Sequence, residues 1–186
     1  MLLLVGLGNP GSDYTNTRHN IGFKIIDAIN LHFKLSKQKP KFKGLLTTGN
    51  IEEKKIYAIK PLTFMNNSGT AIKELIDYFK IDAKDVFVFH DDMDIDFGKI
   101  KAKFGGSSAG HNGIESIDKF IGKDYSRVRV GIGKPKENME VSDYVLQNFD
   151  EDEMMGLEKI TKDITDSISI LVNKKLDLFS STVNNK

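Results

Sequence analysis

An apolar run at residues 2–5 leads directly into the glycine-rich stretch 6–22, whose sequence is GLGNPGSDYTNTRHNIG. An apolar pattern with helical spacing follows from Ile21. A buried strand is therefore predicted to end in a long, shaped loop that leads into a helix. Open α/β sheets bind ligands beyond the carboxyl ends of their strands, which is where this loop would lie. His19 closes the loop, and an imidazole can act as a base near neutral pH.

Apolar segments of strand type and helix type alternate along the rest of the chain. Strands are predicted at residues 2–7, 44–51, 55–60, 86–89, 99–104 and 126–133. Helices are predicted at residues 21–33, 70–79, 114–120 and 151–172. This order predicts an α/β fold: a single compact domain over residues 1–186, with a mixed, mostly parallel twisted sheet and helices on both faces. Residues 174–186 are polar and are expected to form a mobile tail.

The composition is that of an ordinary globular protein, with 39% hydrophobic and 28% charged residues. The chain has no cysteine, which excludes disulfides and thiolate metal ligands. No apolar run approaches the roughly 20 residues that span a bilayer. The N-terminus is predicted to be a strand rather than a signal-type segment. We therefore expect a cytoplasmic protein that contacts no membrane.

The net charge of +1 hides an uneven distribution of charge. Residues 30–60 carry a net charge of +6 and residues 95–136 carry +5, whereas residues 137–170 carry −8. Basic regions of this kind suit a polyanionic partner, although solvated surface lysines explain the pattern equally well. Only three of the 27 basic residues are arginines: Arg18, Arg127 and Arg129. Their planar guanidinium groups suit phosphate or carboxylate partners, which favours an anion-binding protein.

Asp91 lies at the end of the predicted buried strand 86–89 and is the candidate partner of His19. A carboxylate there could orient the imidazole of a general base, or it could simply cap a turn. Four acids cluster after this strand, and hard cations bind several oxygen ligands. They are Asp91, Asp92, Asp94 and Asp96. Acids at this spacing are also typical of plain surface turns, so a metal site is the weaker interpretation.

Residues 6–11 also match the dinucleotide-binding pattern G-x-G-x-x-G. That fingerprint requires a helix that begins at once and directs its amides at a pyrophosphate. Here Pro10 and a polar run delay the helix. A nucleotide-dependent oxidoreductase is therefore a weak alternative, which a titration with a dinucleotide would test.

Asn66 and Asn112 lie in two further small-residue loops, each opening onto a predicted helix, and Asn9 lies in the first loop. A side-chain amide both donates and accepts hydrogen bonds, so it can bind an ester carbonyl or a ribose hydroxyl. Capping a helix is the alternative role. Phe64 is expected in the core, although Phe64 or Tyr14 could stack on a nucleobase.

Five motifs, taken together, resemble those of the bacterial-type peptidyl-tRNA hydrolase family. They are GLGNPG-x2-Y-x2-TRHN-x-G, KP-x-TFMN-x-SG, HDD-x-D, GG-x3-GHNG and R-x-R-x-GIG-x-P. The resemblance runs from Leu4 to about Phe149, in the family's order and spacing, and is highly specific as a set. It implies a compact single-domain α/β fold. It also implies hydrolysis of the ester joining a peptide to the 3′ ribose of tRNA, with no metal and no cofactor.

The resemblance also implies a role for each candidate residue. His19 would be the base that activates water, and Asp91 would hold and polarise His19. The residues implied to bind peptidyl-tRNA are Asn9, Asn66 and Asn112 for the peptide and 3′-terminal nucleotide, Tyr14 and Phe64 for the tRNA side, and Lys103 and Arg129 for the 5′ phosphate. A monomer without a protein partner is expected. An inactive RNA-binding protein on the same fold is the alternative, which the intact His19 and Asp91 disfavour.

Overall fold

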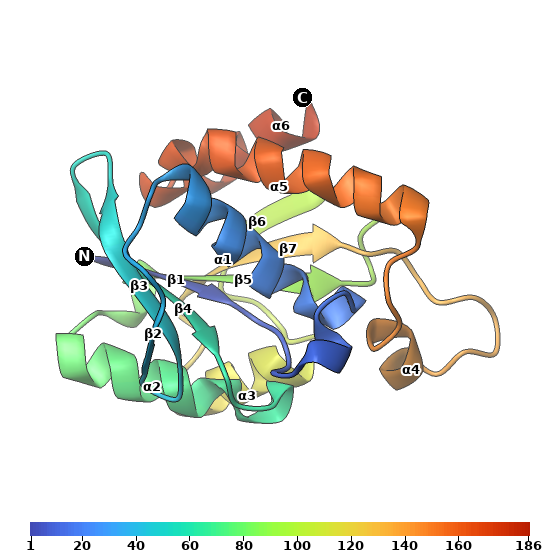
Figure 1. The fold of residues 1–186 in the computed structure, drawn as a ribbon, viewed down its shortest axis with the longest axis horizontal. Helices are drawn as coiled ribbons and strands as arrows, with labels where there is room; N and C mark the ends of the chain where they lie inside the picture. The colour runs from blue at the N-terminus through green and yellow to red at the C-terminus, as the bar shows by residue number, and fades with distance from the viewer.

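The computed structural model describes residues 1–186 and contains one seven-stranded sheet, in the order β2-β3-β4-β1-β5-β7-β6 (Figure 1). The strands are β1 (Leu2–Gly6), β2 (Lys39–Lys41), β3 (Gly44–Ile51), β4 (Lys54–Pro61), β5 (Val86–Asp92), β6 (Ile100–Phe104) and β7 (Ser126–Gly131). The central strands β4, β1, β5 and β7 run parallel, whereas β2, β3 and β6 pair antiparallel to their neighbours. The predicted α/β class with a mixed sheet is confirmed.

Helices cover both faces of this sheet, as predicted. The α-helices are α1 (Ile21–His32), α2 (Ser68–Phe79), α3 (Asn112–Ile121), α4 (Val141–Val145), α5 (Glu151–Val172) and α6 (Leu176–Asn184). Short 3-10 helices are η1 (Ser12–Tyr14), η2 (Arg18–Asn20), η3 (Met65–Asn67) and η4 (Ala83–Asp85). In Figure 1, α1, α5 and α6 lie on one face, and α2 and α3 lie on the other. None of the helices combines the length and apolar character needed to cross a membrane.

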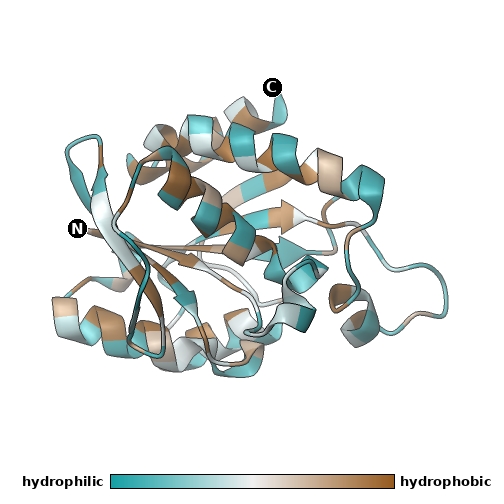
Figure 2. Ribbon diagram, in the orientation of Figure 1, coloured by the Kyte–Doolittle hydropathy of each residue, from teal (hydrophilic) through white to brown (hydrophobic).

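The central strands divide the core into two layers, because successive side chains point to opposite faces of a sheet. Leu4 and Phe87 pack with residues of α1 and α5, whereas Val5 and Val88 pack with residues of α2 and α3. Figure 2 shows the apolar strands between helices whose outer surfaces are polar. Burial on both faces explains why these strands have continuous apolar sequences rather than alternating ones.

Gly6 and Gly22 bring the start of α1 against the ends of β1 and β5. A Cβ atom on Gly22 would lie 2.3 Å from the backbone nitrogen of Leu7 and 2.5 Å from the backbone oxygen of Phe89. One on Gly6 would lie 2.2 Å from the Gly22 oxygen. Only glycine permits this approach, since real Cβ atoms do not come so close. This close contact places His19, just before α1, beside the ends of the central strands β1 and β5.

Several element boundaries differ from the sequence-based predictions. The polar run before α1 contains η1 and η2 rather than a plain loop, and β5 continues to Asp92, so Asp91 lies within the strand. The predicted helix 151–172 is confirmed as α5. Both hydrogen bonds of its capping box are present: the Asp150 side chain accepts from the Glu153 backbone nitrogen, and the Glu153 side chain accepts from the Asp150 backbone nitrogen.

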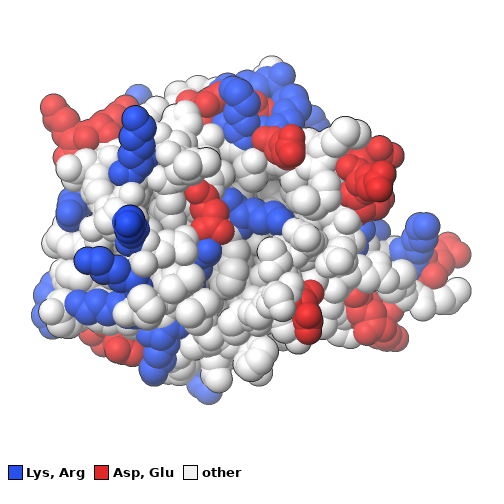
Figure 3. Space-filling model, in the orientation of Figure 1, with Lys and Arg blue, Asp and Glu red and all other residues white.

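Figure 3 shows lysines gathered over the side of β2–β4, and acidic side chains over the first turn of α5.

The expectation of a mobile tail at residues 174–186 is wrong. Most of this segment forms α6, whose Phe179 is fully buried in the core. The Asn184 side chain accepts from the backbone nitrogen of Ile100 and donates to its oxygen, at 2.9 and 2.8 Å. The helix therefore covers β6, which would otherwise be an open edge strand. The signal in the sequence was the helical spacing of Phe179 and Val183.

Candidate active site

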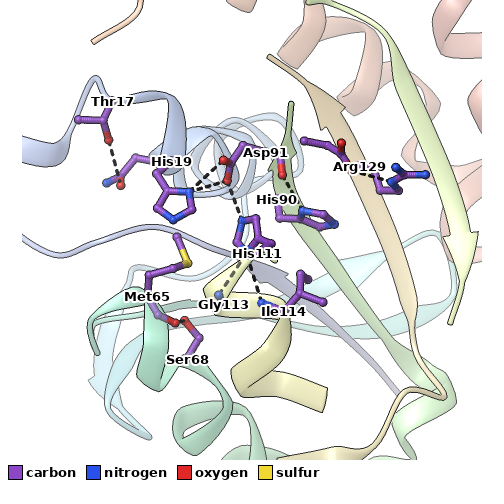
Figure 4. A network of polar contacts seen from close by, with 12 residues as sticks. Thr17, His19, Met65, Ser68, His90, Asp91, His111, Gly113, Ile114 and Arg129 are labelled. Carbon is purple, nitrogen blue, oxygen red and sulfur yellow. Dashed lines mark hydrogen bonds and ion pairs between the residues drawn. The ribbon is translucent and has the colours of Figure 1, made fainter. Parts of the chain in front are cut away.

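Three titratable side chains meet where β1 and β5 end. His19 comes from η2, Asp91 from β5, and His111 immediately precedes α3. Figure 4 shows the two imidazole rings directed at the same carboxylate. All three line a pocket of about 250 Å³, which also contacts α4. The structure thus brings His19 and Asp91 together, although 72 residues separate them in the sequence.

The His19 ring has one engaged nitrogen and one free nitrogen. Nδ1 lies 2.9 Å from each carboxylate oxygen of Asp91. Since an ionised carboxylate only accepts hydrogen bonds, Nδ1 carries the proton and donates it. Nε2 then carries the lone pair, and it makes no hydrogen bond within the protein. His19 is therefore held in the tautomer that a general base requires.

Burial and charge have opposite effects on this pair. Burial alone would lower the pKa of His19, but the Asp91 carboxylate and its hydrogen bond outweigh burial, so the pKa is raised. Burial would raise the pKa of Asp91, but the neighbouring His19 and His111 hold it well below its usual range. Asp91 is thus ionised at neutral pH, and its charge stabilises a proton on His19.

His111 is a candidate site residue that the sequence analysis missed. Its Nε2 lies 2.9 Å from Asp91 Oδ1. Its Nδ1 accepts from the backbone nitrogens of Gly113 and Ile114, at 3.1 and 3.3 Å, and so caps α3. Because Nδ1 accepts, Nε2 must carry the proton and donate to Asp91. The signal in the sequence was a side chain with an acceptor atom at the start of a predicted helix.

His90 lies behind this group and is neutral. Its Nδ1 donates to the backbone oxygen of Asp91 at 2.8 Å. Burial first, and then the proximity of His111, lower the pKa of His90 to about 3. His90 therefore packs beside the pair without adding charge at neutral pH.

Asn9 connects two loops of the site. Its Oδ1 accepts from the backbone nitrogen of Met65 at 2.8 Å. The Asn20 side chain bonds both the backbone nitrogen and the backbone oxygen of Asn9, each at 2.9 Å. The Asn9 Nδ2 makes no hydrogen bond within the protein. Asn9 thus has a structural role through its oxygen and leaves an amide donor available.

Asn66 and Asn112 are exposed, and neither caps a helix. The residue before α2 is Asn67, which makes no capping bond, and α3 is capped by His111. The capping alternative is therefore not supported for either residue. Asn112 lines the pocket beside His111, whereas Asn66 lies in η3 outside that pocket.

The expectation that Phe64 belongs to the core is wrong, because its exposed fraction is 61%. The next residue, Met65, is buried in the core on the side of the sheet that α2 and α3 cover. Tyr14, at the end of η1, is half-buried. The two aromatic residues are therefore accessible to a ligand to different degrees.

Lys103 and Arg129 line a second pocket of about 170 Å³. Its lining includes His90 and Asp92, which also line the first pocket, so the two pockets adjoin. Arg129 Nε donates to Asp92 Oδ2 at 2.7 Å, whereas Lys103 is exposed and has no ion-pair partner. Arg127 is buried and bonds Asp118 at 2.8 Å, so that arginine is structural.

The four acids at the end of β5 and just after it do not form a cation site. Asp91 contacts histidines, Asp92 pairs with Arg129, and the remaining two are exposed. His19, Asp91 and His111 do offer ligand atoms within 4.8 Å of one another. However, a metal ligand needs a lone pair, and capping of α3 occupies that of His111 Nδ1 and leaves the proton on Nε2. This donor set fits hydrogen bonding better than metal coordination.

Residues 106–110 also fit the nucleophile-elbow pattern G-x-S-x-G, with Ser108 at its centre. That pattern requires a sharp strand-to-helix turn and a histidine beside the serine. Ser108 instead lies in the loop between β6 and α3, and its hydroxyl donates to Glu115 at 3.3 Å. The geometry therefore favours water over a serine as the attacking group.

Comparisons with known proteins identify the family to which the chain is similar. A family model described as "Peptidyl-tRNA hydrolase" matches residues 3–186. A peptidyl-tRNA hydrolase of Pelagibacter ubique is 77% identical over 100% of both chains. One of Ehrlichia canis is 46% identical over 98% of this chain and 94% of the relative. The crystal structure of peptidyl-tRNA hydrolase from Acinetobacter baumannii, 33% identical, superposes with a TM-score of 0.92 and covers 99% of this chain and 94% of that chain.

Proposed function

Because this chain belongs to the peptidyl-tRNA hydrolase family, we propose that it hydrolyses the ester between a peptide, or an N-blocked amino acid, and the 3′ ribose of tRNA. Such a reaction recycles tRNA from prematurely released peptidyl-tRNA. The observation that supports the proposal most strongly is the His19–Asp91 pair, in which Nδ1 is engaged and Nε2 is free. An ester is more easily hydrolysed than an amide, so one base with polar donors suffices.

In the proposed mechanism, His19 Nε2 takes a proton from water as the water oxygen attacks the ester carbonyl. Asp91 stabilises the imidazolium that forms, without itself accepting the proton. The imidazolium then returns its proton to the departing 3′ oxygen of the ribose. Amide donors of Asn9, Asn66 and Asn112 would stabilise the negative charge that develops on the carbonyl oxygen or hold the terminal nucleotide.

The direct test is incubation with N-blocked aminoacyl-tRNA, scored by release of the blocked amino acid. We expect multiple turnovers, unchanged by EDTA because no step uses a metal. Binding of tRNA without any release would favour the alternative, a non-catalytic RNA-binding protein on the same fold.

We also propose that the chain acts as a monomer in the cytoplasm, which size-exclusion chromatography and cell fractionation would test.

A first prediction concerns the proposed 5′ phosphate site. Lys103→Ala should raise KM for tRNA substrates and reduce the slope of log KM against log salt concentration by about one unit. It should hardly affect a short ester that carries only the terminal nucleotide. Lys101→Ala is the matched control, since Lys101 lies on the same strand but does not line the pocket. Equal losses on both substrates would rule this role out.

A second prediction concerns the exposed asparagines. Asn66→Asp or Asn112→Asp keeps the size of the side chain but removes its amide donor. If the donor stabilises the developing oxyanion, the rate should fall about 10²-fold or more. The melting temperature should change little, because neither side chain caps a helix. Asn67→Asp serves as the control, and a loss of stability that matches the loss of activity would contradict the substrate role.

A further inference from the structure

Arg18, the residue before His19, has a buried guanidinium group that contacts residues 147–153. Its Nη2 lies 2.8 Å from Glu153 Oε2. Its Nη1 donates to the backbone oxygen of Asn148 at 3.1 Å and reaches that of Gln147 at 3.5 Å. The side chain is only 9% exposed, so these contacts are shielded from water. The planar guanidinium group of Arg18 therefore donates hydrogen bonds to a carboxylate and to main-chain oxygens at the same time.

The same guanidinium group lies over two aromatic rings, those of Tyr144 and Phe149. Its central carbon is 4.5 Å from the centre of the Tyr144 ring and 5.6 Å from that of Phe149. Desolvated cation–π contacts of this kind are among the stronger ones. Tyr144 belongs to α4, and its hydroxyl donates to the backbone oxygen of Ile132 at 2.6 Å. Arg18 thus contacts both α4 and the segment that follows it.

The backbone supports the same connection. The Arg18 nitrogen donates to the Gln147 oxygen at 3.0 Å, and the Phe149 nitrogen donates to the Asn16 oxygen at 3.1 Å. Glu153 Oε2, which accepts from Arg18, also accepts from the Asp150 nitrogen at 2.9 Å in the capping box of α5. The segment between α4 and the first turn of α5 is therefore attached to the turn that carries His19.

This attachment matters because α4 forms one wall of the pocket that contains His19. Val141, Ser142 and Val145 of α4 line the pocket together with His19, Asp91 and the loop of His111. Since α4 is only one and a half turns long, its own backbone bonds do little to hold it in place. We infer that Arg18 is a positioning residue that fixes the α4 wall relative to His19, and so sets the width of the substrate pocket.

The inference rests on the proposed hydrolysis, and its first test is a split between KM and kcat. Arg18→Lys keeps the charge and can still pair with Glu153, but it loses the fork to the carbonyl oxygens. We expect KM for N-blocked aminoacyl-tRNA to rise about tenfold, with kcat within about twofold of wild type. The acidic limb of the pH–rate profile should not move, because Arg18 contacts neither Asp91 nor the His19 ring.

A second measurement, hydrogen exchange of backbone amides, tests the position of α4 and the segment after it without using substrate. Amide exchange at Gln147 and Phe149 should accelerate in Arg18→Lys, while amides of α3 keep their wild-type rates. Lys24→Ala is the matched control, since Lys24 bonds the Asn16 side chain of the same loop but does not reach α4 or α5. It should change neither KM nor exchange. If the wild-type protein shows no turnover but exchange is faster in Arg18→Lys, the proposed function is contradicted. The inference that Arg18 holds α4 in place would still be supported.

Two results would overturn the inference. One is an Arg18→Lys protein in which KM and the exchange of Phe149 are both unchanged. The other is a fall in kcat alone, which would mean that Arg18 acts on His19 directly. If Arg18→Lys does not fold, Glu153→Gln decides, because it weakens the same contact from the α5 side. That variant should raise KM in the same direction by a smaller factor, and an unchanged KM would equally contradict the role.

Discussion

His19→Ala should abolish turnover of N-blocked aminoacyl-tRNA while tRNA binding stays nearly intact. Loss of a general base typically costs ~10²–10⁴-fold in rate, and loss of water positioning adds to this. Binding should survive because the His19 side chain bonds only Asp91, and Lys103 and Arg129, which we assign to the 5′ phosphate of tRNA, line the second pocket instead. Single-turnover rates measured together with the Kd for uncharged tRNA would separate the two effects.

His32→Ala provides the matched control, since His32 is an exposed histidine at the end of α1, far along the same helix from the site. It should leave both rate and binding unchanged. Turnover of His19→Ala at a rate near that of wild type would exclude His19 as the base. A loss of tRNA binding as large as the loss of rate would instead place His19 in recognition.

Asp91→Asn should have the next largest effect, because it disturbs two histidines together. His111 must donate through Nε2, so it competes for the single oxygen of the new amide. The amide nitrogen then faces His19 Nδ1 and favours a lone pair there, which places the proton on Nε2. His19 would be held in the wrong tautomer, and the rate plateau should fall by ~10²-fold or more.

The same variant should also change the dependence on pH. In wild type, the Asp91 carboxylate outweighs burial and raises the pKa of His19, so kcat/KM should fall as pH drops through that raised value. Without the carboxylate, burial dominates and the pKa falls below its ordinary range. The acidic limb should therefore move to lower pH, beneath a reduced plateau. A pH–rate profile with plateau and limb both unmoved would contradict the role of Asp91.

Local patterns in the sequence were enough to predict most of the elements. The hairpin of β3 and β4, helix α1 and the capping box of α5 all follow from periodicity or cap chemistry within a few residues. The buried strand that carries Asp91 was predicted for the same reason, although its end extends to Asp92. The pairing of His19 with Asp91 was expected from the place of each residue at the end of a strand or loop.

Features that depend on contacts between distant segments were missed or wrong. The role of His111 depends on its bond to Asp91, which no local pattern indicates. Phe64 and Met65 are both large and apolar, and only the tertiary structure shows that Met65 is buried while Phe64 is exposed. The contact of Arg18 with Glu153 joins residues 135 positions apart. The tail was misjudged because its polar composition outweighed a short apolar stripe that packs against the sheet.

The central claim is that Asp91 keeps the proton on Nδ1 of His19, so that Nε2 is the base. Nitrogen-15 NMR of labelled imidazoles tests this most directly, since the chain has only four histidines. His19 is assigned by its loss in His19→Ala. The account predicts the Nδ1–H tautomer at neutral pH, with a pKa above the ordinary value of 6.5 that falls in Asp91→Asn. An Nε2–H tautomer in wild type, or a pKa below 6.5, would contradict it.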